Sequence, residues 1–433
     1  MKMLRLLILP LLLLAAPLRA EVAIQEVTSP GGIKAWLVED HSIAFTALEI
    51  RFRGGTALDA PGKRGAVNLM TALIEEGAAE MDAQAFAEAR DGLAAEFRFD
   101  SSVDSLGVSA RMLTENRDRA AELLRLALTV PRFDADAVER VRGQVLANIR
   151  AGAKDPQVIA GQAFDALAFG DHPYGSSGDG TEASVTALTR DDIVAAHRAT
   201  LARDRVVVAA VGDITPQALG ALLDHLLAGL PATGAPLPGP APVALTGGVT
   251  VQHFPTPQSV VIFGHEGIER TDPDYVAAYV LNEIIGGSRF SARLMTELRE
   301  KRGLTYGVGT YLLDYDQADL IMGQFATDNR TAGAAIAVLR DEWAKAGQVT
   351  AEELAATKTY LTGAYPLRFD GNGPIAQVLV GMQMAGYSMD YPKTRNALIE
   401  AVTLDDLARV ATRLFRPDAL RVVVVGQPEG LAP

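Results

Sequence analysis

Two stretches that repeat each other decide the fold. Residues 189–212 read TRDDIVAAHRATLARDRVVVAAVG and residues 403–426 read TLDDLARVATRLFRPDALRVVVVG, and the two align without a gap. Each opens with a Thr three positions before an Asp, which is typical of a capped helix start, and closes with a continuous apolar run that is typical of a buried strand. The repeat therefore predicts two copies of one helix-and-strand unit.

The two copies are expected to form tandem domains of about 200 residues each, which is a common domain size. We place the N-terminal domain at residues 21–230 and the C-terminal domain at residues 246–433. The segment between them, residues 231–245, begins with PATGAPLPGPAP, which has five prolines in twelve residues and cannot continue a helix or a central strand. We interpret this segment as a semi-rigid linker.

Both copies open with two strand-like segments, followed by helical patterns, further strands and more helices. The opening segments are residues 33–38 and 44–53 in the first copy and residues 249–253 and 258–264 in the second. This order is typical of an α+β fold. We expect an antiparallel-rich β-sheet in each domain, with helices packed on one face.

The first twenty residues are predicted to be a signal peptide and not a part of the fold. Lys2 and Arg5 precede a short apolar run, and residues 18–20 are compatible with a cleavage site, so export is expected, in a bacterium to the periplasm. The run is too short to span a bilayer comfortably. Cysteine is absent, which excludes disulfides, thiolate metal sites and a lipid-modified cysteine anchor. We therefore expect no membrane anchor after the signal is removed.

The charge of the chain argues against nucleic acid as a partner. The formal net charge is −13, and removal of the signal with its three basic residues would make it −16. Binding of nucleic acid needs concentrated positive surface, and no basic run occurs after residue 20.

The segment Glu297 to Tyr306, ELREKRGLTY, has the pattern of a helix end that leads into a strand. Gly303 suits the left-handed residue that ends a helix, and residues 304–311 then alternate like a strand. Arg299 in the last helical turn and Tyr306 at the start of the strand are thus expected to face one cleft. A cation and a phenol donor together suit a substrate carbonyl that becomes an oxyanion.

A purely structural explanation stays open for these residues. Arg299 would also complement the helix dipole, and Tyr306 would also fill a half-buried strand position. Gly286 and Gly287 follow an apolar helical segment and are most simply a helix stop and a turn. The same two glycines would let a bound peptide pass close to the bare backbone, and the two interpretations are compatible.

Residues 286–306, GGSRFSARLMTELREKRGLTY, resemble the Arg/Tyr motif of the pitrilysin and insulinase family of zinc metallopeptidases. In that family an Arg and a Tyr seven positions later contact the substrate opposite the zinc ion, and here these positions are Arg299 and Tyr306. The resemblance extends over essentially all of the mature chain. It implies two domains of the LuxS- and pitrilysin-like metallopeptidase fold.

The zinc-binding residues that this resemblance implies for active members are missing. Those members carry His-x-x-Glu-His on one helix, where the two histidines bind zinc and the Glu is the general base. The matching text here has Asn68 and Ala72 in place of the histidines and Thr71 in place of the base. The third ligand, a Glu, would match Asn148. We therefore expect no metal in this chain.

Other residues are not expected to rebuild the site. Glu75 and Glu76, one turn further on, are interpreted as a solvated helix face, and the six histidines have no metal-binding spacing. An autonomous hydrolase with an unrecognised site is therefore the least favoured hypothesis.

The resemblance implies a non-zinc-binding subunit of an exported heteromeric zinc metallopeptidase that cleaves peptides. In the family, two halves close a catalytic chamber, and this chain has the size of one half. A zinc-binding pitrilysin-like subunit is the expected partner, in a heterodimer or a larger complex, and zinc is expected in that subunit. Arg299 and Tyr306 would bind the substrate and the oxyanion, and Gly286 and Gly287 the substrate. The alternative is a non-proteolytic periplasmic peptide-binding or scaffold protein on the same fold.

Overall fold

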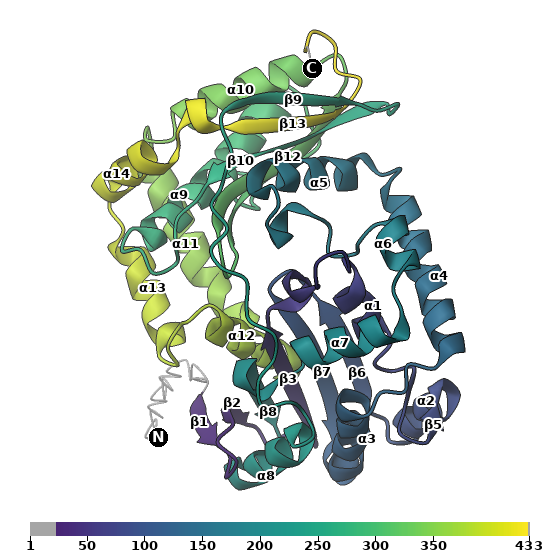
Figure 1. The fold of residues 1–433 in the computed structure, drawn as a ribbon. Coiled ribbons are helices and arrows are strands. Elements are labelled where there is room, and N and C mark those ends of the chain that lie inside the picture. The colour runs from purple at the N-terminus through teal and green to yellow at the C-terminus, as the bar shows by residue number, and fades with distance from the viewer. Residues whose placement is uncertain (1–22, 432–433) are drawn as a thin grey trace, which may run out of the picture.

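Two mixed β-sheets dominate the fold (Figure 1). The computed structural model describes residues 23–431, so the predicted signal peptide lies outside the described residues. The strand orders are β1-β2-β8-β3-β7-β6 in the first sheet and β11-β12-β10-β13-β9 in the second. In each sheet one pair of strands is parallel, β2 with β8 and β9 with β13, and all other pairs are antiparallel. The predicted α+β fold with antiparallel-rich sheets is confirmed.

The described part of the first half, from residue 23, builds the first sheet, a small hairpin and eight α-helices. Its strands are β1 (Gln25–Thr28), β2 (Lys34–Glu39), β3 (Phe45–Arg53), β4 (Gly77–Ala78), β5 (Met81–Asp82), β6 (Glu96–Ser101), β7 (Ser105–Leu113) and β8 (Val206–Gly212). Its helices are α1 (Ala66–Ala72), α2 (Ala83–Gly92), α3 (Arg117–Thr129), α4 (Ala135–Gly152), α5 (Pro156–Phe169), α6 (Glu182–Thr186), α7 (Arg190–Thr200) and α8 (Pro216–Leu227).

The second half, as far as residue 431, builds the second sheet and six α-helices. Its strands are β9 (Gly248–His253), β10 (Gln258–Glu266), β11 (Val308–Asp314), β12 (Asp319–Asp328) and β13 (Arg421–Gly426). Its helices are α9 (Tyr275–Gly286), α10 (Ala332–Ala344), α11 (Ala351–Ala364), α12 (Asn372–Met384), α13 (Tyr391–Ala401) and α14 (Leu404–Leu414).

The two repeated stretches form equivalent helix-and-strand units, α7 with β8 and α14 with β13. Thr189 and Thr403 are the N-caps of their helices, and the hydroxyl of each accepts a hydrogen bond of 3.2 Å from the backbone N–H of the Asp three positions later. The carboxylate of that Asp accepts in return from the backbone N–H of the Thr, at 2.8 Å in the first unit and 2.9 Å in the second. Both capping boxes were predicted from the repeat.

The apolar runs of β8 and β13 are continuous because both faces of each strand are buried. In β13, Val422 and Val424 pack among helices of the second half, while Val423 and Val425 face the opposite side of the sheet. In β8, Val208 and Ala210 pack among helices of the first half, and their neighbours point the other way. Each sheet therefore has helices of its own half on one face, as predicted, and a second buried face.

The second face of each sheet is covered by a helix from the other half of the chain. α5 packs on β10 and β13 through Phe164 and Ala168, and α12 packs on β3 and β8 through Leu379 and Val380. Figure 1 shows α5 against the upper sheet and α12 beside β8 and β3. The two halves thus exchange one helix each, and two smaller apolar clusters contain residues of both halves, while each half keeps a main core of its own.

The segment predicted as a linker has neither helix nor strand between α8 and β9, and it lies against the folded chain. The N–H of Ala241 donates to the carbonyl of Gln317 at 2.9 Å, and the N–H of Ala244 donates to the carbonyl of Ala168 at 2.8 Å. Ala241 is buried in the same apolar cluster as α5. The domain boundaries themselves stay a prediction. Between residues 23 and 431, none of the helices combines the length and the apolarity needed to cross a bilayer.

Candidate functional site

The Arg/Tyr segment lies in the second half, where a helix leads to the edge strand β11. The helix ends in a π-helical turn, η5 (Met295–Glu300). Gly303 follows with a φ of 61°, so the predicted left-handed helix stop is confirmed. Its N–H donates to the carbonyl of Arg299 at 2.9 Å. This hydrogen bond fixes the backbone of Arg299 at the end of the helix.

Tyr306 lies in a turn and not in a strand. The strand expected over residues 304–311 begins only at Val308. The reason is Thr305, whose buried hydroxyl donates to the carbonyl of Ala326 in β12 at 2.7 Å. Because Thr305 points inward, the next side chain points outward, and Tyr306 is 88% exposed.

Arg299 and Tyr306, which were expected to face one cleft, contact one another. The guanidinium carbon of Arg299 is 4.9 Å from the centroid of the Tyr306 ring and 4.8 Å from the centroid of the Phe290 ring. Within residues 23–431 the Arg299 guanidinium donates no hydrogen bond and joins no ion pair. Stacking between two rings leaves the edge of the guanidinium, and so its N–H groups, available to a ligand.

Phe290 is a candidate site residue that the sequence analysis did not identify. It is 66% exposed and completes the aromatic contacts of Arg299. A large aromatic residue between the small polar residues of GGSRFS was the available signal, because such a residue in a turn has no obvious place in a core.

The other basic residues of the motif are engaged with an acid on the same turn. Lys301 Nζ lies 2.6 Å from Glu297 Oε1, and Arg302 Nη1 lies 2.5 Å from Glu297 Oε2. Hydrogen bonds from Lys301 and Arg302 hold the pKa of the Glu297 carboxyl below its usual value. Within residues 297–306, Arg299 is thus the cation without an acidic partner.

Gly286 and Gly287 end α9, and both are buried. A Cβ on Gly286 would lie 2.5 Å from the Thr310 hydroxyl, and a Cβ on Gly287 would lie 2.8 Å from Glu283 Cα. Packing therefore requires a glycine at both positions, in agreement with the interpretation as a helix stop. Gly286 also lines a cavity of about 570 Å³ together with Gly307, the neighbour of Tyr306.

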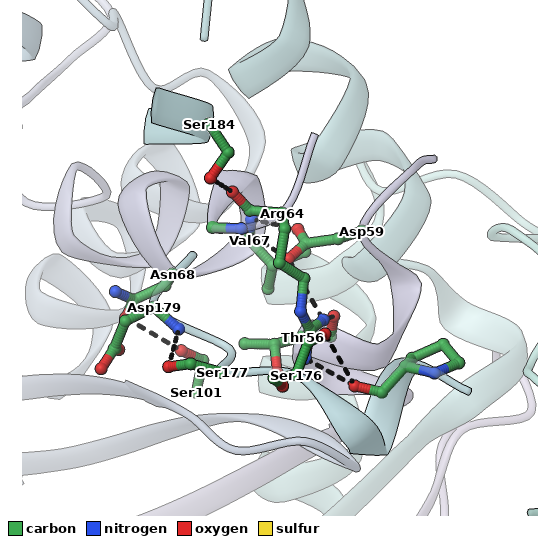
Figure 2. A network of polar contacts seen from close by, with 12 residues as sticks. Thr56, Asp59, Arg64, Val67, Asn68, Ser101, Ser176, Ser177, Asp179 and Ser184 are labelled. Carbon is green, nitrogen blue, oxygen red and sulfur yellow. Dashed lines mark hydrogen bonds and ion pairs between the residues drawn. The ribbon is translucent and has the colours of Figure 1, made fainter. Parts of the chain in front are cut away.

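α1 is the helix that corresponds to the metal helix of active family members. The carboxylate of Asp59 caps it by accepting hydrogen bonds of 2.8 Å from the N–H groups of Gly65 and Val67 (Figure 2). Thr71, at the position of the general base, is buried, and its hydroxyl donates to the carbonyl of Val67 at 2.8 Å. Because this hydroxyl is hydrogen-bonded to the helix backbone, it is not positioned to act as a base.

The remaining positions of the metal site carry no suitable ligands. The amide oxygen of Asn68 accepts a long hydrogen bond of 3.5 Å from Ser101 (Figure 2), and that of Asn148 accepts one of 3.3 Å from Gln144. Ala72 offers a methyl group. Among the described residues there is no cluster of three or more His, Cys, Asp or Glu side chains that could hold a metal ion. The residues present do not fit the zinc site of the active enzymes.

The two carboxylates near the end of α1 are paired with arginines. Glu75 Oε1 lies 2.9 Å from Arg90 Nη1, and Glu76 forms an ion pair with Arg140. Burial raises the pKa of the Glu75 carboxyl, and the hydrogen bond from Arg90 opposes that shift. Both carboxylates therefore have a structural role, which is more specific than the solvated helix face that was expected.

A polar cavity of about 350 Å³ adjoins Asn68 where the family would have its metal. Asp165 of α5 lines it, and burial raises the pKa of the Asp165 carboxyl to about 6. Asp179 and Arg64 line the same cavity. Two carboxyl groups beside a guanidinium and several hydroxyl groups can hold a proton or a polar ligand, but they do not provide the three or four ligands that zinc needs.

Together these features define a class of protein. It has two halves with equivalent sheets, an exposed Tyr in contact with a half-buried Arg in the second half, and in the first half a helix at the metal position without metal ligands. This is a pitrilysin-like protein in which the site for the metal is degenerate.

Comparisons with known proteins point to the same family. The sequence model of the family described as "Peptidase M16 inactive domain" matches residues 187–361, which include the Arg/Tyr segment. Among solved structures, the peptidase M16 inactive domain from Pseudomonas fluorescens superimposes with a TM-score of 0.87 at 27% identity, over 95% of this chain and 99% of that one. The chain is thus similar to members of the M16 peptidase family, in agreement with the resemblance to pitrilysin and insulinase.

Relatives with curated names differ in the activity that their names state. A "non-peptidase homolog" from Helicobacter pylori is 26% identical over 76% of this chain and 77% of its own length. An "uncharacterized zinc protease" from Streptomyces coelicolor is 26% identical over 90% of this chain and 86% of its own. The names therefore do not decide whether this chain takes part in proteolysis, and the decision rests on its site.

Proposed function

We propose that this chain is the non-zinc-binding subunit of an exported heteromeric peptidase whose metal is held by a second M16-like chain. The observation that carries the proposal is the pair of Arg299 and Tyr306. Both side chains contact one another at the surface, Tyr306 is 88% exposed, and Arg299 has no polar partner within the described residues. A structural role leaves such a pair at the surface unexplained, whereas a substrate-binding role requires it.

In the assembled peptidase the two residues act on the scissile peptide. The Tyr306 hydroxyl donates a hydrogen bond to the oxygen that becomes negatively charged, and Arg299 donates to that oxygen or to a neighbouring peptide carbonyl. The rings of Phe290 and Tyr306 hold the guanidinium in place before substrate arrives, so less ordering is needed in the reaction. The partner chain supplies the metal chemistry.

The cavity beside the pair supports a path for the peptide. Gly286 and Gly307 line it, and at Gly307, where a Cβ would meet nothing within 4 Å, the bare backbone permits close approach of another chain. Glu283 and Gln324 provide polar groups on its walls. A peptide in this cavity would continue directly past Tyr306, because Gly307 is the next residue.

The test is the substitution Tyr306→Phe in a complex with a zinc-binding M16 partner. The variant keeps the ring that contacts Arg299 and loses only the hydroxyl. We expect kcat/KM for peptide cleavage to fall by roughly 100- to 1,000-fold, the usual effect of losing one oxyanion donor, while the complex still assembles in gel filtration.

Tyr360→Phe is the matched control. Tyr360 is a tyrosine on α11 that is 41% exposed and lies outside the cavity beside Tyr306. This control is expected to cleave like the wild type. Wild-type turnover by Tyr306→Phe would refute the role of Tyr306.

A second function is a peptide-binding or scaffold protein without any role in proteolysis. The name of the H. pylori relative, a non-peptidase homolog, favours it. In that case Arg299 and Tyr306 are dispensable, and the complex of wild-type chain with a zinc-binding partner cleaves no faster than the partner alone.

A further inference from the structure

A second cavity, of about 580 Å³, lies in the second half among α9, α12, α13 and the turn at residues 365–368. Its volume is in the range of small-molecule sites. It is separate from the Arg/Tyr pair, since neither Arg299 nor Tyr306 lines it. Five tyrosines contribute to its walls, namely Tyr275, Tyr279, Tyr365, Tyr387 and Tyr391.

The charge of this cavity is positive in an acidic chain. Arg270, Arg368 and Arg395 line it, and no Asp or Glu does. The charge of Arg270 is compensated by an acid that does not line the cavity, because its Nη2 lies 2.5 Å from Asp314 Oδ2. The other two arginines join no ion pair within residues 23–431. Two guanidinium groups without an ion pair at one cavity favour an anionic occupant.

Arg395 has the geometry of an anchored binding group. It is 7% exposed, its Nη1 donates to the carbonyl of Leu361 at 3.1 Å, and its guanidinium carbon is 4.3 Å from the centroid of the Tyr365 ring. Glu283 is close enough to Arg395 for their charges to interact, but it does not line the cavity. Arg368, in contrast, is exposed and forms no hydrogen bond among the described residues. One arginine is thus fixed in the wall, and the other is available to a ligand.

The aromatic walls favour a flat ligand. Tyr387 and Tyr391 stack with their ring centroids 3.8 Å apart and their planes at 13°. Arg270 holds this pair in place, because its Nη1 donates to the Tyr387 hydroxyl at 2.9 Å. Aromatic faces and phenol hydroxyls on the walls can stack on a ring and bind its polar substituents, which an aliphatic chain would not use.

We propose that this cavity binds a small anionic ligand with a planar aromatic body. The acid group of the ligand pairs with Arg368 and Arg395, and its ring packs on the tyrosines. The site is independent of the peptidase role proposed above, and its experiment does not require a partner chain.

The experiment is isothermal titration of the purified chain with three probes of similar size. 1-Naphthoate carries both the charge and the rings, 1-naphthamide lacks the charge, and octanoate lacks the rings. We expect 1-naphthoate to bind most tightly of the three. Equal binding of 1-naphthamide or octanoate, or no binding of 1-naphthoate at millimolar concentration, would overturn the proposal.

Two substitutions locate the binding in this cavity. Arg368→Gln is expected to weaken 1-naphthoate binding by roughly 5- to 10-fold, the effect of losing a charge-assisted hydrogen bond at an exposed position. Tyr391→Leu is expected to weaken 1-naphthoate and to leave octanoate unchanged, because it removes only the stacked face. Arg330→Gln, at an exposed arginine that is paired with Asp328 outside the cavity, is the control and should bind like the wild type. Unchanged 1-naphthoate affinity in Arg368→Gln, with circular dichroism showing a folded chain, would contradict the assignment.

Discussion

At the scale of single residues, the site depends on how Arg299 is held. Its guanidinium contacts the rings of Phe290 and Tyr306, so the side chain is held by contacts that do not use its hydrogen-bond donors. A salt bridge would have ordered the side chain equally well, but it would have used the same N–H groups that a peptide carbonyl needs. Contacts with aromatic rings therefore hold the Arg299 side chain in place and leave its N–H groups available to a ligand.

A buried histidine gives the second half a pH dependence that can be tested. Trp343 Nε1 donates to His265 Nε2 at 3.1 Å, so this nitrogen is an acceptor, and His265 Nδ1 must donate to the carbonyl of Glu266 at 2.7 Å. The ring is thus neutral, and burial lowers the pKa of His265 to about 4. The unfolded state takes up a proton near pH 6.5, whereas the folded state does so only near pH 4. Stability is fully present above pH 6.5 and is lost as the pH falls toward 4.

The substitution His265→Gln removes the imidazole ring, and with it the proton that the unfolded state takes up near pH 6.5. We expect the free energy of unfolding of the wild type to fall between pH 6.5 and pH 4 by about 3 kcal/mol more than that of the variant. Urea unfolding at pH 7, 6, 5 and 4.5 measures the difference. His253→Gln, at an exposed histidine, is the control. Parallel pH profiles of wild type and His265→Gln would show that the ring is not held neutral.

At the scale of elements, the two exchanged helices join the halves, because each helix packs on the sheet of the other half. Phe164 of α5 is fully buried against the sheet of the second half, although α5 belongs to the first half. The ring fits the space left by Gly264 in β10, where a Cβ would lie 3.1 Å from the Phe164 Cζ atom. α5 is therefore required by the second sheet as much as by its own half.

The substitution Phe164→Ala tests this coupling. Loss of a fully buried Phe is expected to lower the free energy of unfolding by about 3–5 kcal/mol, because it removes burial and leaves a cavity. Leu167→Ala, on the same helix at a residue that is 38% exposed, is the matched control and should cost less than about 1 kcal/mol. Urea unfolding followed by circular dichroism gives both values. Equal costs for the two variants would mean that α5 is not anchored on the second sheet.

The elements that the sequence predicts correctly are those with a local signal. The capped helices after Thr189 and Thr403, the strands β8 and β13, and the helix stop at Gly303 all follow from residues close together in the chain. The start of β11 was placed too early, because the hydrogen bond from Thr305 to Ala326 joins residues 21 positions apart and replaces the strand. The exchange of α5 and α12 rests on contacts between distant parts of the chain, and no local pattern specifies such partners.

The candidate site likewise contains some residues that a local sequence pattern predicts and others that only the structure reveals. Arg299, Tyr306 and the missing metal ligands are visible in the sequence because each belongs to a short motif. Phe290 and the tyrosine-lined cavity are visible only in the structure, since the residues around that cavity come from separate elements over residues 270–399.

At the scale of the whole molecule, the proposal that this chain presents half of a catalytic site rests on two observations. The chain's metal helix is intact as a helix, capped by Asp59, but the residues on it do not fit zinc. Its Arg/Tyr pair lies at the surface and has no partner within the described residues that would explain it. The two observations lead to one expectation, namely that a second chain brings the metal to this pair.

The most direct test of this expectation is the rate at which a zinc-loaded M16 chain with an intact His-x-x-Glu-His motif cleaves peptides, with and without this chain at equal concentration. The account predicts that each chain alone is nearly inactive and that mixing them raises the rate by at least about 100-fold, the contribution of one oxyanion donor. A rate that does not change when this chain is added would contradict it.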